Sequence, residues 1–102
     1  MAEFITVATT DELKSGERTV VEVKEHYIAV FNVDNHYYAI EDLCTHDDGP
    51  LAEGELTGMV IECPRHGAQF DITSGKVLRF PAIKPVPRYD VRVENGEIQI
   101  KI

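Results

Sequence analysis

The sequence predicts an all-β fold. Apolar and polar residues alternate with a period of two along most of the chain, and no window long enough for a substantial helix shows a period of 3.6 residues. Turn signals separate the alternating segments at intervals of roughly 8 to 12 residues, which is typical of a β-sandwich or barrel. Because the chain has 102 residues, we expect one domain with a single modest core.

The alternation and the turn residues set the expected elements. Asn95-Gly96 predicts a type I′ hairpin turn, because both positions of this turn need a positive φ. Asp34-Asn35 and Ser74-Gly75 mark two more turns, and Thr10 is expected to cap one short helical turn. The last hairpin should place its apolar residues on one face, namely Val91, Val93, Ile98, Ile100 and Ile102. The expected strands are 4–7, 19–23, 27–32, 37–40, 59–62, 69–71, 76–79, 89–94 and 97–101.

Residues 80–89 read FPAIKPVPRY and contain three prolines. Proline cannot donate a ladder hydrogen bond, so this segment is not expected to form a central strand. Its apolar residues predict a stiff, extended loop that packs on another part of the molecule.

The net charge is −8, and it is unevenly distributed. From 41 to 62 the chain has no Lys or Arg but seven carboxylates, which are Glu41, Asp42, Asp47, Asp48, Glu53, Glu55 and Glu62. Such a stretch disfavours nucleic acid and anionic lipid and favours a basic protein surface, although it also fits a solvated loop. The sequence shows no apolar run of about 20 residues and no signal-peptide pattern, which predicts a cytoplasmic protein that contacts no membrane.

The two cysteines each precede a histidine, in the pattern Cys44-x-His46 and Cys63-x-x-His66. A disulfide would leave both histidines unexplained and is disfavoured in a reducing cytosol. A Cys2His2 zinc site is possible, but zinc sites usually pair Cys with Cys and His with His. Mixed loops suit a Rieske [2Fe-2S] centre, in which two thiolates hold one iron and two imidazoles hold the other. The remaining histidines, His26 and His36, are expected to be ordinary turn residues.

With its C-x-H and C-P-x-H-G patterns, the chain resembles the Rieske-type ferredoxins of aromatic-ring-hydroxylating dioxygenase systems, over essentially all 102 residues. The resemblance implies antiparallel sheets and a cluster-binding subdomain made of two ligand loops and a Pro loop, which corresponds to Pro81 to Pro85. It implies one domain over 1–102, with its cluster-binding part at about 41–85. The resemblance also implies that Cys44 and Cys63 hold an inner iron and that His46 and His66 hold an outer iron near the surface. The match is looser at Phe80, where the family often has Gly.

The resemblance also implies a function. A protein of this kind carries single electrons on one [2Fe-2S] cluster, from a flavin-containing NAD(P)H-dependent ferredoxin reductase to a terminal oxygenase, and a monomer is expected. An enzyme is not expected, because only His26 and His36 remain to build a separate iron site. The alternatives are a Rieske-fold subunit of another redox complex, such as nitrite reductase, and a structural zinc module. We expect Pro50, Leu51 and the Pro81 loop to meet the partner, with Asp47 and Asp48 attracting basic residues.

Four positions depart from the high-potential Rieske proteins. Gly49 and Arg65 stand where those proteins have an additional disulfide, and Ala68 and Phe70 replace a Ser and a Tyr that donate hydroxyl hydrogen bonds to sulfur. Each lost donor removes stabilisation of the electron-rich reduced state. The sequence therefore predicts a reduction potential toward the low end of the Rieske range.

Overall fold

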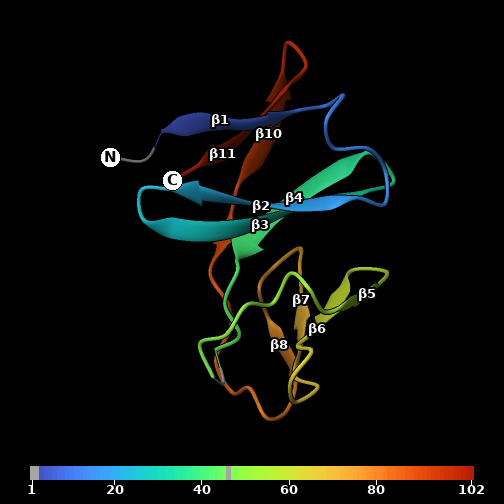
Figure 1. The fold of residues 1–102 in the computed structure, drawn as a ribbon, viewed down its shortest axis with the longest axis vertical. Coiled ribbons are helices and arrows are strands. Elements are labelled where there is room, and N and C mark those ends of the chain that lie inside the picture. The colour runs from blue at the N-terminus through green and yellow to red at the C-terminus, as the bar shows by residue number, and fades with distance from the viewer. Residues whose placement is uncertain (1–2, 46) are drawn as a thin grey trace.

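The computed structural model describes residues 3–45 and 47–102, and in these residues it contains strands but no helix (Figure 1). All strand pairs are antiparallel, as the family resemblance implies. The strands are β1 (Phe4–Thr9), β2 (Arg18–Val23), β3 (His26–Val33), β4 (His36–Glu41), β5 (Glu55–Thr57), β6 (Val60–Glu62), β7 (Gln69–Asp71), β8 (Val77–Arg79), β9 (Arg88–Tyr89), β10 (Val91–Glu94) and β11 (Glu97–Lys101). The all-β prediction is confirmed.

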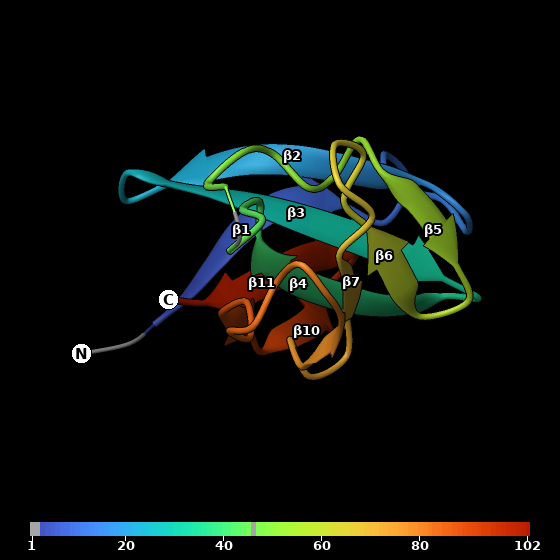
Figure 2. The ribbon, with the colours of Figure 1, turned by 90° about the horizontal axis from the view of Figure 1, so that it is seen from below.

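The strands form three sheets, with the orders β1-β11-β10, β2-β3-β4-β9 and β5-β6-β7-β8. The third sheet lies at the opposite end of the long axis from the first (Figure 1). Three connections extend beyond the third sheet at this end: the segment after β4, the β6–β7 loop and the segment after β8. They face the viewer when the molecule is seen from below (Figure 2). The sequence motifs with Cys44 and Cys63 lie on the first two of these connections.

Three hairpins use two-residue turns in which both residues have a positive φ. The angles are 49° and 69° at Lys24-Glu25, 53° and 66° at Asp34-Asn35, and 53° and 75° at Asn95-Gly96. Type I′ turns have this geometry, and their twist matches that of the flanking strands. The predictions at Asp34-Asn35 and Asn95-Gly96 are confirmed. A turn was expected between strands 19–23 and 27–32, but not its type I′ geometry, because neither Lys24 nor Glu25 is typical of a left-handed backbone.

Strand β3 is buried on both faces, and its alternating side chains enter two different cores. Ile28 and Val30 pack in a cluster that also contains Ile98 and Ile100. Ala29 and Phe31 belong to a second cluster, which includes both cysteines. Full burial of a side chain such as Phe31 contributes about 1.5 to 3 kcal/mol. The second core therefore anchors the cysteine loops on the central sheet.

The structure corrects several predicted elements. Strand β5 was missed, because three residues give too little alternation to recognise. The expected strand 89–94 is divided at Asp90 into β9 and β10, which belong to different sheets. Strand β9 pairs with β4 at a sheet edge, where the preceding prolines are tolerated. Val93 pairs with Ile98, as the prediction of one shared apolar face requires, but Val93 is 47% exposed whereas Ile98 is buried.

The expected cap at Thr10 is wrong by one residue. The carbonyl oxygen of Thr9 accepts hydrogen bonds from the N–H groups of Glu12 and Leu13, at 3.1 and 3.3 Å. Thr9 Oγ1 accepts the Glu12 N–H at 3.3 Å, and the Glu12 carboxylate accepts the Thr9 N–H at 2.9 Å, which is the reciprocal arrangement of a capping box. The segment forms a turn rather than a helix.

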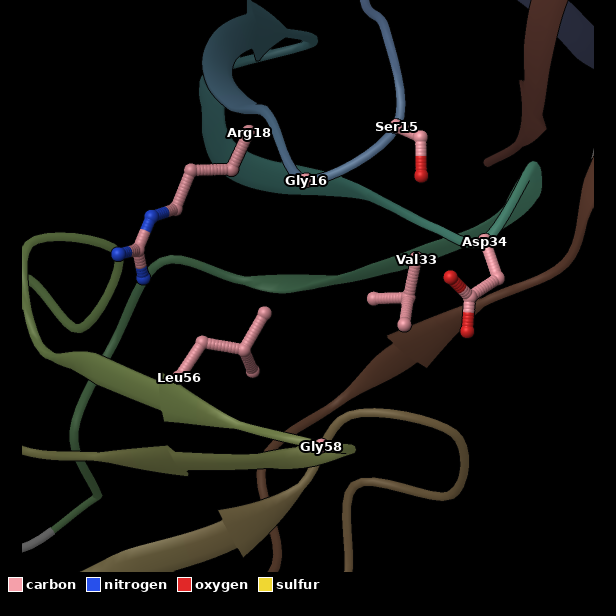
Figure 3. Close-up of a pocket in the computed structure, with 7 residues that line it drawn as sticks. All are labelled: Ser15, Gly16, Arg18, Val33, Asp34, Leu56 and Gly58. Atoms are coloured by element: carbon pink, nitrogen blue, oxygen red, sulfur yellow. The ribbon is translucent and has the colours of Figure 1, made fainter.

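A hollow of about 280 Å³ separates β5 from the segment before β2 and from the β3–β4 turn (Figure 3). Arg18 lies at its rim and donates from Nη1 to the carbonyl oxygen of Gly54 at 2.8 Å. This bond ties β2 to the segment that leads into β5. Across the described residues, no helix is long and apolar enough to cross a membrane.

Candidate metal centre

The two cysteine loops have the same main-chain hydrogen bond at their bases. The Cys44 N–H donates to the carbonyl oxygen of Gly49 at 2.8 Å, and the Cys63 N–H donates to that of Ala68 at 2.7 Å. In both cases the acceptor lies five residues after the cysteine. The loops therefore close in the same way, although the cysteine-to-histidine spacing differs between them.

A second bond repeats as well. The carbonyl oxygen of Cys44 accepts the Asp48 N–H at 2.8 Å, and that of Cys63 accepts the Gly67 N–H at 3.1 Å. Each of these donors lies four residues after its cysteine and has a positive φ, 60° for Asp48 and 78° for Gly67. This correspondence was not visible in the sequence, because glycine marks the left-handed position in only one of the loops.

The loops bring the two thiols together in the core. Cys44 is 0% and Cys63 1% exposed, and the two are not joined in a disulfide. The two sulfurs and a carboxylate oxygen of Asp47 all lie within 4.8 Å of one another. Two thiolates on one tetrahedral ion lie about 3.8 Å apart when each bond is about 2.3 Å. The disposition of the sulfurs therefore fits two thiolates that share one metal ion.

The described histidine of the motif lies at the surface. The His66 side chain is 54% exposed, and its Nδ1 lies 3.6 Å from an Asp47 oxygen. The second loop thus presents a buried sulfur and an exposed imidazole, as a site with two chemically different ends requires. His46, the predicted ligand in the first loop, lies outside the described residues.

The other histidines lie where the sequence placed them, at the first positions of β3 and β4. Nδ1 of His26 lies 3.1 Å from a Glu41 carboxylate oxygen. Within residues 3–45 and 47–102, neither His26 nor His36 belongs to a group that could hold a metal ion.

The third loop packs beside the first. Thr45 donates from Oγ1 to the carbonyl oxygen of Lys84 at 2.7 Å. Ala82 and Val86 are 3% and 2% exposed and belong to the core that contains the cysteines. The Val86 N–H donates to the carbonyl oxygen of Gly75 at 2.8 Å. The Pro-rich segment therefore packs on the site, as its apolar residues predicted.

Arg65 contacts both cysteine loops, which the sequence did not reveal. Its guanidinium donates to the Asp47 carboxylate, to the Pro50 carbonyl oxygen and to the sulfur of Cys63, at 2.6, 2.8 and 3.3 Å respectively. The hydrogen bond from Arg65, together with one from the Gly49 N–H, holds the pKa of Asp47 below its usual range, and the pKa of Arg65 is raised by the same pairing.

The acidic stretch is less available to a partner than its composition suggests. Asp47 is paired with Arg65, and Oδ1 of Asp42 accepts the N–H groups of Leu51 and Ala52, each at 2.7 Å. Glu41 accepts the Tyr89 hydroxyl, whose pKa is raised by burial and by this bond. Leu51 is 0% exposed, so the prediction that it meets a partner is wrong.

Comparison with known proteins decides the family. Residues 3–90 match the Rieske [2Fe-2S] domain family. This chain belongs to that family. A Rieske domain implies an iron–sulfur cluster, so the family match and the geometry of the buried cysteines favour this centre over the zinc module considered from the sequence.

Curated relatives and solved structures of Rieske proteins agree. The chain is 35% identical to the ferredoxin component of naphthalene 1,2-dioxygenase/salicylate 5-hydroxylase systems from a Ralstonia species. The alignment spans 99 residues, which are 97% of this chain and 95% of the relative. The ferredoxin of carbazole 1,9a-dioxygenase from Nocardioides aromaticivorans has a TM-score of 0.90 and 35% identity, over 95% of each chain. A further structure is described as a complex of reduced oxygenase and oxidised ferredoxin in carbazole 1,9a-dioxygenase. It matches with a TM-score of 0.88 and 35% identity, over 95% of this chain and 91% of the other.

These comparisons confirm the resemblance to Rieske-type ferredoxins of aromatic dioxygenase systems and the corresponding fold. The relatives are named as ferredoxin components, which supports an electron carrier over an enzyme and over a nitrite reductase subunit.

Proposed function

We propose that this chain holds one [2Fe-2S] cluster, with Cys44 and Cys63 on the inner iron and His46 and His66 on the outer iron. The buried, adjacent thiols on two loops with matching hydrogen bonds carry this proposal. The exposed imidazole of His66, three residues after the buried Cys63, supports an outer iron near the surface. Residues 1–102 form a single Rieske domain in this proposal, with its cluster-binding part at about 41–85.

The chain is proposed to carry electrons between two proteins. A Rieske cluster accepts and releases one electron, with a potential that depends on hydrogen bonds to its sulfurs. Cys44 and Cys63 keep the thiolate end away from water, and His66 gives a route for the electron at the surface. A carbazole 1,9a-dioxygenase ferredoxin is seen with its oxygenase, which supports a terminal ring-hydroxylating oxygenase as the acceptor. A flavin-containing NAD(P)H-dependent reductase as donor, a cytoplasmic location and a monomeric state remain predictions.

The cluster is tested by metal and sulfide analysis of protein purified without oxygen. We expect two irons and two labile sulfides per chain, a coloured protein, and a rhombic electron paramagnetic resonance signal after reduction. The His66→Cys substitution should move the spectrum toward that of an all-thiolate cluster, because thiolate replaces imidazole on one iron.

The matched controls are His26→Gln and His36→Gln, which should leave the spectrum unchanged because both residues lie at hairpin turns. Stoichiometric zinc without iron, in protein produced with ample iron, would contradict the proposed cluster.

The reduction potential is expected near the low end of the Rieske range, at roughly −150 mV. Ala68 and Phe70 are fully buried and donate no hydroxyl hydrogen bond. Voltammetry should show that Ala68→Ser raises the midpoint, whereas Ala29→Ser, which buries a hydroxyl on β3 in the same core, should not. A wild-type midpoint above roughly +100 mV would be incompatible with this explanation.

A further inference from the structure

Arg65 joins the two cysteine loops through one side chain. It belongs to the second loop, but Nε and Nη2 donate to both carboxylate oxygens of Asp47 in the first loop, at 2.6 and 3.1 Å. Nη1 donates to the carbonyl oxygen of Pro50 at 2.8 Å. A planar guanidinium makes these bonds simultaneously, which a lysine ammonium cannot do.

The residue below the guanidinium must be small. A Cβ added at Gly49 would lie 2.5 Å from Cζ of Arg65, well inside contact distance. Gly49 therefore leaves the space in which Arg65 lies across the first loop.

The same ion pair brings two opposite charges to the thiolates. Nη2 of Arg65 donates to the sulfur of Cys63 at 3.3 Å. An oxygen of Asp47 lies within 4.8 Å of both cysteine sulfurs. A donor to sulfur and a positive charge favour the reduced, more negative state of a cluster, whereas a carboxylate opposes it.

We propose that Arg65 is a positioning residue that ties the two ligand loops together and raises the reduction potential, while Asp47 orients Arg65 and lowers the potential. This inference rests on the proposed cluster. It revises the view from the sequence that Arg65 marks only a missing disulfide, since Arg65 provides a donor to sulfur.

Midpoint potentials of Arg65→Gln, Asp47→Asn and the double variant test the proposal. Arg65→Gln should make reduction about tenfold less favourable, which is about 59 mV for a one-electron couple, and Asp47→Asn should shift it in the opposite direction. The double variant should return toward the wild-type value. Arg65→Lys should recover part of the potential but lose the cluster faster in denaturant, because it cannot bridge the loops.

The control is Arg92→Gln, which removes an ion pair with Glu94 on β10, in a different sheet. Iron content is measured for every protein, so a wild type without iron would count against the proposed function rather than against Arg65. Iron-loaded Arg65→Gln and Asp47→Asn proteins with unchanged midpoints, or with midpoints that move in the same direction, would overturn the role of Arg65. A purely structural ion pair would change retention of the cluster without these opposite shifts.

A separate observation concerns the surface beside the third loop. Leu78, Phe80 and Ile83 are 47%, 77% and 72% exposed and line an open groove of about 620 Å³. Exposed large apolar side chains that lie together indicate an interaction site more strongly than scattered ones. The groove adjoins the site, since Ala82 lines it and belongs to the core with both cysteines.

The charge of this segment is opposite to that of the first loop. From 72 to 89 the chain has no Asp or Glu but four basic residues, which are Lys76, Arg79, Lys84 and Arg88. Arg79 lines the groove, and Lys84 follows Ile83. In the part of the chain that the structure describes, Arg79 and Lys84 form no ion pair.

We infer that this groove docks the terminal oxygenase, through a contact surface that has an apolar projection surrounded by carboxylates. The oxygenase is chosen because a related ferredoxin forms a complex with its oxygenase. This inference rests on the proposed electron-carrier function. It differs from the expectation that basic residues of a partner surround the apolar contact, because the exposed apolar residues lie in a segment that has cations and no carboxylates.

Stopped-flow rates with a ferredoxin reductase and with a terminal oxygenase, measured separately, test the groove. The double substitution Phe80→Ser and Ile83→Ser should slow transfer to the oxygenase at least tenfold and leave reduction by the reductase unchanged. Arg79→Glu with Lys84→Glu should slow transfer to the oxygenase at low salt. Val93→Ser, which changes another exposed apolar residue on β10, should affect neither transfer.

The cluster spectrum and the midpoint should not change in the Phe80→Ser and Ile83→Ser variant, because these side chains are exposed and no charge is altered. Transfers that are both unaffected, or both slowed equally, would overturn the inference. Concentration-dependent dimers of the wild type that the Phe80→Ser and Ile83→Ser substitutions abolish would assign the groove to a second copy and also overturn it.

Discussion

Gly54→Ala is expected to lower the free energy of unfolding by about 3 to 5 kcal/mol, at the upper end of effects for single substitutions. A Cβ at this position would lie 1.7 Å from the carbonyl oxygen of Glu62 and 3.2 Å from that of Leu51. These are main-chain atoms in a buried segment, so the collision cannot be relieved by rotating a side chain. Glu62 directly precedes Cys63, and its displacement should therefore release the cluster as well.

Gly58→Ala is the matched control in the same β5–β6 hairpin. Gly58 has a φ of +61°, and nothing lies within 4 Å of an added Cβ. The substitution should lower stability by about 1 to 2 kcal/mol through backbone strain alone. Denaturant titrations followed by cluster absorbance and by circular dichroism measure both effects. Equal losses in the two variants would show that the contact with Glu62 does not restrict Gly54.

The hairpins show what the sequence predicts well. Asn95-Gly96 is a local signal, because these two residues adopt the left-handed backbone without help from distant residues. Lys24-Glu25 makes the same kind of turn without such a signal. Its conformation is imposed by the pairing of β2 with β3, and pairing between strands cannot be read from a dipeptide.

The candidate metal centre also has one part that the sequence predicts and one part that depends on distant contacts. The spacing of the two Cys/His pairs predicted that Cys44 and Cys63 come together, and the structure places their sulfurs within 4.8 Å of each other. Arg65 contacts Asp47 and Pro50 across two different loops, and Arg65 and Asp47 are 18 residues apart in the sequence. These contacts depend on how the two loops meet in space. Leu51 was expected to meet a partner, but the Asp42 carboxylate accepts its N–H and the residue lies in the core.

Asp42→Ala is expected to lower the free energy of unfolding by about 3 kcal/mol. One carboxylate oxygen accepts the N–H groups of Leu51 and Ala52, which are 0% and 6% exposed. Removing the carboxylate leaves both buried N–H groups without their acceptor. Each unsatisfied buried donor lowers the free energy of unfolding by about 1 to 3 kcal/mol. Asp42 lies two residues before Cys44, so the first cysteine loop should loosen and the cluster should bleach faster in denaturant.

Two further substitutions separate this explanation from a general effect of losing a carboxylate. Asp42→Asn keeps an acceptor oxygen of similar position and should recover most of the stability. Asp71→Ala removes a carboxylate oxygen that also accepts two hydrogen bonds, from the N–H and the hydroxyl of Thr73 at 2.8 and 2.6 Å, but on the surface. Because water can replace these exposed bonds, its loss should stay near 1 kcal/mol or below. If Asp71→Ala were as destabilising as Asp42→Ala, or if Asp42→Asn gave no recovery, the buried amides would not be the reason for the effect.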